Sequence, residues 1–153
     1  MARMQTSRSF SIPHLYNVEF PVGKGQANRT DDVALVQFFL NVAWQGRRQI
    51  PELADAEAPP DLAVDGIFGT LTEKKLILYQ LNMDKDSSGF VPGLTADGIV
   101  HPVKSFAFTR RGIPMTMTSL NQHFRQLRPQ EFLQLGVAAS LPPILAKSLL
   151  CVG

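Results

Sequence analysis

The chain has 153 residues, of which 44% are hydrophobic and 18% are charged, a globular composition that excludes a disordered chain. A single cysteine, Cys151, excludes an internal disulfide, so the hydrophobic core must supply the stability. Residues 1–29 and 104–153 are basic and residues 30–103 carry eleven acidic against five basic side chains, but the basic residues are scattered and match no nucleic-acid motif. We therefore expect the basic flanks to fold onto the acidic centre rather than to contact an anionic partner, and we expect no nucleic-acid binding.

Targeting signals are missing from the given sequence. Its first twenty residues contain basic side chains but no apolar run of signal-peptide length, and no later run is long enough to span a bilayer. We expect the chain to be cytoplasmic as synthesised, with no membrane span. Export to the periplasm or cell wall would then need a dedicated machine, such as a phage or a secretion system.

The first predicted element is a helix over residues 30–45, TDDVALVQFFLNVAWQ. Apolar residues occupy one helical face at regular spacing and continue onto the other side, which predicts a central and mostly buried helix. Thr30 or Asp31 is expected to cap its first N–H groups, and Gly46 is expected to end it.

An acidic connector over residues 51–63 follows, and its two adjacent prolines exclude a helix. The stretch VDGIFGTLTEKKLILYQ then combines an Asp-Gly turn with a second predicted helix over residues 71–82. Thr70 and Glu73 have the spacing of a capping box, in which the Thr70 hydroxyl accepts the Glu73 N–H.

The Asp-Gly turn occurs twice. The sequence LAVDGI, residues 62–67, returns as LTADGI, residues 94–99, with the two aspartates 32 positions apart. In each copy the leucine and isoleucine are expected to enter the core, and the aspartate and glycine to form the turn. The match predicts one loop structure used twice.

Residues 104–153 read as shorter elements. SFAFTRRGIPMTMT, residues 105–118, alternates at its start and is typical of an extended segment or hairpin. A helix is predicted from Thr118 or Ser119 to Arg128, a second from Pro129 to a stop at Gly136, and a terminal helix over residues 141–150.

The order of these motifs resembles the bacterial peptidoglycan-binding domain, a small three-helix module. The family pattern has V-x-x-L-Q in a first helix, then D-G-x-F-G-x-x-T, then F-Q, then G-L-x-x-D-G. The matching residues here are Val36, Gln37, Leu40, Asp65, Gly66, Ile67, Phe68, Gly69, Thr72, Tyr79, Gln80, Gly93, Leu94, Asp97 and Gly98. The chain departs from the pattern at His101-Pro102, where the family has a glycine, and in the bulkier KKLILYQ of the second helix.

The resemblance implies a mainly α fold, with a three-helix peptidoglycan-binding-domain-like core and paired Asp-Gly loops. It predicts an N-terminal extension over residues 1–29, the domain over residues 30–103, and a helical C-terminal extension over residues 104–153 packed on the core. It also implies a ligand site at the first turn and the start of the second helix. The candidate contacts are Asp65, Gly66, Phe68, Thr72 and Tyr79, for each of which a purely structural role is the alternative.

Catalytic and metal-binding motifs are missing. His14, His101 and His123 are far apart, so we expect no metal site, no cofactor and no enzyme. The run Asp84-Lys-Asp86-Ser-Ser88-Gly89 copies the first half of a calcium loop, but Thr95 stands where such a loop needs a glutamate, which leaves a solvated turn as the alternative.

We therefore expect a non-catalytic peptidoglycan-binding module. A protein–protein adaptor that reuses the same fold is the alternative. A wall hydrolase is a third class, but no pair of carboxylates in the sequence is marked for that role.

Overall fold

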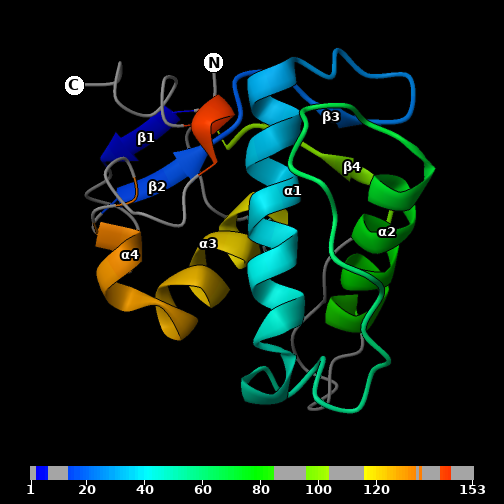
Figure 1. Cartoon of the computed structure of the whole chain (residues 1–153), viewed down its shortest axis with the longest axis vertical. Helices are drawn as coiled ribbons and strands as arrows, with labels where there is room; N and C mark the ends of the chain where they lie inside the picture. The colour runs from blue at the N-terminus through cyan, green and yellow to red at the C-terminus, as the bar shows by residue number, and fades with distance from the viewer. Residues whose placement is uncertain are drawn as a thin grey trace.

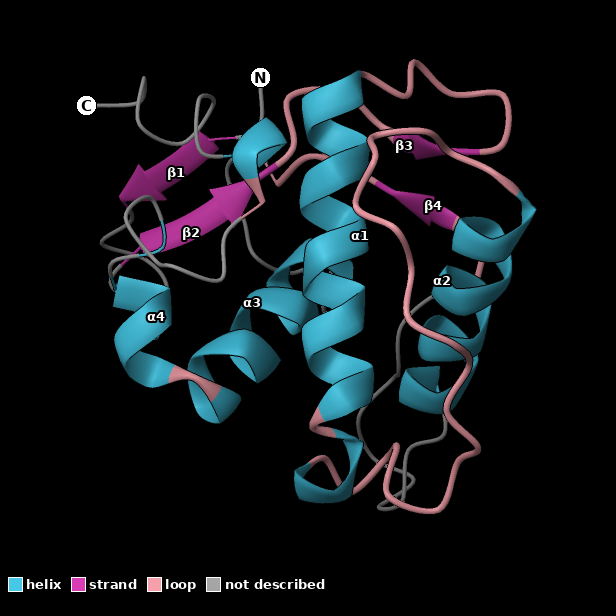
Figure 2. Ribbon diagram, in the orientation of Figure 1, coloured by secondary structure: helices cyan, strands magenta, loops and turns pink. Residues whose placement is uncertain are grey.

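The computed structural model describes residues 3–6, 14–84, 96–103, 116–133, 135 and 142–145. The described helices are α1 (Thr30–Gln45), α2 (Thr70–Asp84), α3 (Thr116–Leu127), α4 (Pro129–Leu133) and the short 3-10 turn η1 (Arg47–Gln49). The described strands are β1 (Arg3–Thr6), β2 (His14–Asn17), β3 (Val22–Gly23) and β4 (Ile99–Val100). The prediction of a mainly helical chain is confirmed, as Figure 2 shows.

Helix α1 is the centre of the fold. It has α2 on one side and α3, α4 and the β1–β2 pair on the other (Figure 1). Every residue from Asp32 to Trp44 is buried, because neighbouring elements cover all of its faces. The predicted bounds of this helix are confirmed, and so is its predicted burial.

The beginnings of both long helices differ from the prediction. Neither Thr30 nor Asp31 caps α1, since the cap position is Arg29 and no side chain bonds there. At α2 the Glu73 N–H donates to the Gly69 carbonyl at 3.0 Å, so the expected bond to the Thr70 hydroxyl is wrong. The cap residue of α2 is therefore Gly69, a residue type that helices accept at this position.

The four strands form two separate antiparallel pairs, which we did not predict. In one pair Met4 lies opposite Tyr16, and in the other Val22 lies opposite Val100. The strands contain only two to four residues, too few for an alternating pattern to stand out in the sequence. The second pair joins the segment before α1 to the second Asp-Gly turn.

Buried asparagines tie distant segments together by bonding a backbone N–H and a carbonyl of the same residue. Asn17 bonds Val103 in this way, at 3.0 Å to its N–H and 2.7 Å to its carbonyl. Asn121 of α3 likewise bonds the Tyr16 N–H and carbonyl, both at 2.8 Å. These amides satisfy backbone groups that would be costly to bury unpaired.

One hydrophobic core includes side chains from all three predicted parts of the chain. Phe39 of α1 stacks on Phe124 of α3 with ring centroids 4.9 Å apart, and Tyr16 meets Phe132 of α4 edge to face at 5.2 Å. Such ring pairs add stability beyond the area they bury. Residues on either side of the predicted segment 30–103 therefore share its core.

The C-terminal part agrees with the prediction in some of its elements. Helix α4 begins at Pro129 as predicted, and α3 buries Leu120 and Phe124. Helix α3 begins at Thr116, two residues before the earlier of the two predicted caps. The last three residues of the predicted extended segment 105–118 belong to α3, so that part of the prediction is wrong. Residues 105–115, the stop at Gly136 and most of the terminal helix lie outside the described residues.

Candidate functional site

The first Asp-Gly turn is clamped by Gln37, a buried glutamine in the middle of α1. Its amide nitrogen has two N–H groups and three acceptors within hydrogen-bond distance, so one N–H is shared. These acceptors are Asp65 Oδ1 at 3.1 Å, the Ile67 carbonyl at 3.0 Å and Thr72 Oγ1 at 3.1 Å. Its amide oxygen accepts the Gly66 N–H at 3.0 Å. One side chain thus joins the central helix, the turn and the first turn of α2.

The second turn is built in the same way around Gln80 of α2. The two N–H groups of that amide face three acceptors, Asp97 Oδ1, the Ile99 carbonyl and Thr116 Oγ1, at 3.4, 3.2 and 3.0 Å from the nitrogen. Its oxygen accepts the Gly98 N–H at 2.8 Å. The predicted repeat is therefore a repeated hydrogen-bond clamp, formed by a helix glutamine, an Asp-Gly turn and a threonine in the next helix.

The two glycines of the first turn have different roles. Gly66 has φ +75°, and a Cβ there would lie 2.5 Å from Thr30 Cγ2 and 2.6 Å from the Thr30 carbonyl oxygen. Gly69 has open space around it and is not among the residues of positive φ. The backbone therefore requires glycine at position 66 but not at position 69.

Two of the five predicted contacts are accessible at the turn, and three are buried. Asp65 is exposed, and Phe68 is half-buried against the core. Gly66, Thr72 and Tyr79 are buried. The bonds from the Ile67 N–H and the Gln37 amide hold the pKa of the Asp65 carboxyl below its ordinary value. A ligand at this turn would therefore meet a carboxylate.

Tyr79 belongs to a polar cluster between α2 and α3. Its hydroxyl lies 2.8 Å from Ser119 Oγ and 2.7 Å from His123 Nδ1. Burial raises the pKa of Tyr79 and lowers the pKa of His123, which favours a neutral tyrosine next to a neutral histidine. The Tyr79 side chain is fully buried, so the cluster links the two helices and offers no face to a ligand.

Two apolar residues at and after the first turn are exposed. Ile67 and Leu71 are each 68% exposed. Both lie within five residues of chain at the turn and the start of α2. Ile67 was expected to enter the core, and this expectation is wrong, because the turn leaves its side chain in solvent. The exposure of Leu71 was not predicted. The sequence signal for the exposure of Leu71 was its position between two threonines at the start of the predicted helix.

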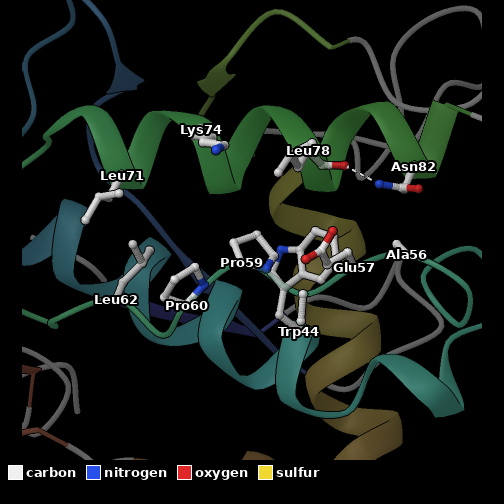
Figure 3. A pocket seen from close by; sticks show the side chains of 11 residues that line it. Trp44, Ala56, Glu57, Pro59, Pro60, Leu62, Leu71, Lys74, Leu78 and Asn82 are labelled. Atoms are coloured by element: carbon white, nitrogen blue, oxygen red, sulfur yellow. Dashed lines mark hydrogen bonds between the residues drawn. The ribbon is translucent and has the colours of Figure 1, made fainter.

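A groove of about 500 Å³ lies between α2 and the connector (Figure 3). One wall is an outer face of α2, the other is the connector, and the indole of Trp44 lies between them. The lining residues are Trp44, Ala56, Glu57, Ala58, Pro59, Pro60, Leu62, Leu71, Lys74, Leu78 and Asn82. None of the five predicted contacts lines the groove, but its residue Leu71 lies two residues after Gly69 of the first turn.

The connector wall is held in place by polar contacts from the helices. Asn41 bonds both the N–H and the carbonyl of Leu62 at 2.8 Å. The buried ammonium of Lys75 donates to the Pro60 carbonyl at 3.0 Å and to Asn41 Oδ1 at 3.1 Å. Burial lowers the pKa of Lys75, although Asp61 Oδ1 lies 3.7 Å away. These contacts give the groove a fixed wall.

Among the described residues, no three histidine, cysteine or acidic side chains come together in a way that could hold a metal ion. Of the predicted calcium run only Asp84 is described, as the last residue of α2, and Cys151 lies outside the described residues. No helix in the described ranges combines the length and apolar character needed to cross a bilayer.

Comparison with known proteins adds no relative. No protein-family model, no curated protein and no solved structure matches the chain. Any statement on function therefore depends on the residues and their geometry.

Proposed function

We propose that this chain is a non-catalytic module that binds bacterial peptidoglycan at the first Asp-Gly turn. The observation that carries the proposal is the clamp built twice, by Gln37 at the first turn and by Gln80 at the second. The residues of the first clamp, and Gln80, Asp97 and Gly98 of the second, fall in the motif that resembles the peptidoglycan-binding domain, whereas Thr116 lies outside it. The repeat gives the resembling residues a shared structural role, which supports a common core.

The first turn offers suitable chemistry for this ligand. Asp65 presents an exposed carboxylate, and Ile67 presents an exposed apolar side chain beside it. Peptidoglycan has amide, hydroxyl and amine groups that can donate to a carboxylate, and methyl groups that can cover an isoleucine. The turn is held rigidly by its clamp, which lowers the entropy lost on binding.

A protein–protein adaptor is the second candidate, and the exposed pair Ile67 and Leu71 favours it. Apolar side chains at 68% exposure are typical of surfaces that a protein partner covers. This candidate predicts a stable complex isolated from native cells and no retention on cell walls. The first candidate predicts the reverse.

Co-sedimentation with purified sacculi tests the proposal. We expect the wild-type protein to sediment with sacculi and Ile67→Ser to lose most of that binding. Leu133→Ser is the matched control, because Leu133 is also exposed, at 57%, but lies on α4. Absence of retention at low salt, or equal loss in both variants, would contradict the proposal.

A further inference from the structure

We propose that the groove between α2 and the connector binds the peptide part of peptidoglycan, with Lys74 facing a ligand carboxylate and Glu57 facing a ligand amine. This inference rests on the proposed function and adds a second contact to it. The groove starts at Leu71, two residues after the end of the first turn, so one ligand can extend from the turn into the groove.

The groove has the volume of a small-ligand site, and its connector wall is rigid. Its volume of about 500 Å³ falls within the usual range for such sites. The prolines of its connector wall restrict the backbone, and the Leu62 and Pro60 backbone is bonded to Asn41 and Lys75. A ligand therefore meets a wall that is already formed.

Two side chains of opposite charge line the groove, one on each wall, so a complementary ligand carries one group of each charge. Lys74 lies on the helix wall, and Glu57 lies on the connector wall (Figure 3). Both are exposed, and neither forms an ion pair with another residue of the described part of the chain. A short peptide with a carboxylate and an amine satisfies both charges, whereas Glu57 and the acidic connector repel a polyanion.

The apolar lining favours peptide over sugar. Leu71 is 68% exposed, while Trp44 is only 1% exposed, so the accessible apolar surface is aliphatic side chain and proline rather than an aromatic ring. Methyl groups of a peptide can cover that surface. A sugar ring would bury hydroxyl groups against it without partners, which is costly.

Calorimetric titration of the full chain tests the inference. The probes are stem peptides and peptide-free glycan strands, both prepared from the same sacculi by cutting the amide that joins peptide to sugar. We expect the peptides to bind, Lys74→Glu to weaken that binding about tenfold or more, and Lys24→Glu to leave it within about twofold. Lys24 is the matched control, because it is an exposed lysine outside the groove.

Parallel sedimentation with sacculi separates the two proposals. Sacculus binding without peptide binding, or peptide binding that Lys74→Glu leaves unchanged, overturns the groove assignment and leaves the proposed function standing. Peptide binding that depends on Lys74, without retention on sacculi, supports the groove and overturns the proposed function. Circular dichroism of each variant shows whether a loss reflects unfolding.

Discussion

Replacing Gln37 with methionine removes one complete clamp while keeping the length of the side chain. The change deletes two N–H donors, which face three acceptors, and the oxygen that accepts the Gly66 N–H. At about 1 kcal/mol for each net bond, and more for a group left buried without a partner, we expect a loss of about 3–5 kcal/mol in the free energy of unfolding. That loss is large against a typical total of about 5–15 kcal/mol.

Urea unfolding followed by fluorescence measures this loss directly. Trp44 is the only tryptophan and is 1% exposed, so its emission reports the opening of the core. Gln80→Met should cost a similar amount, slightly reduced because the bond from Gln80 to Asp97 is long, at 3.4 Å. Gln126→Met is the control, since its amide makes an exposed bond to the Gln49 carbonyl.

The reasoning fails if the Gln37 and Gln80 variants stay within about 0.5 kcal/mol of the wild type, as surface substitutions usually do. It also fails if only one of the two variants is strongly destabilised, because the clamps make the same set of bonds. A change in the slope of the unfolding curve would indicate an altered denatured state rather than a lost clamp.

Three further outcomes follow from other residues. Gly66→Ala should destabilise the fold by several kcal/mol, because residue 66 has a positive φ and a Cβ there would clash with Thr30. Gly69→Ala should change the midpoint of unfolding little, because the space around Gly69 is open. Similar midpoints for the two variants would contradict this account of the turn. Burial raises the pKa of Asp32 to about 6, from an unfolded value of 3.8. Ionisation of Asp32 therefore lowers the free energy of unfolding by up to about 3 kcal/mol as pH rises from 4 to 6. Unfolding measured at several pH values should show this decrease in the wild type but not in Asp32→Asn. Burial lowers the pKa of His123, so its contribution to stability should decline as pH falls below 6.5, and a His123→Gln variant that keeps the same acid dependence would refute the assignment.

The sequence predicted α1 and the two turns because their signals are local. A sixteen-residue apolar pattern defines a helix, and Asp-Gly between apolar residues defines a turn. The role of Gln37 and Gln80 was missed, although a single glutamine within an apolar helix is a visible sign of a buried polar partner. Their partners lie 28 and 17 positions away at Asp65 and Asp97, so no common spacing revealed the pairing.

Other features depend on contacts between segments that are far apart in the sequence. Asp32 lies in the first turn of α1, and its carboxylate accepts the N–H groups of Glu19 and Phe20, thirteen and twelve positions earlier, at 2.9 and 3.0 Å. The groove was equally hidden, because it exists only where the connector lies along α2. Glu57 and Lys74 come from separate elements, and neither stands in a motif.

The most direct test of the central claim is a binding isotherm of the pure protein on purified sacculi at low salt. Our account predicts saturable binding, loss of most of that binding in Ile67→Ser, and no loss in Leu133→Ser. The absence of saturable binding by folded wild-type protein would contradict it.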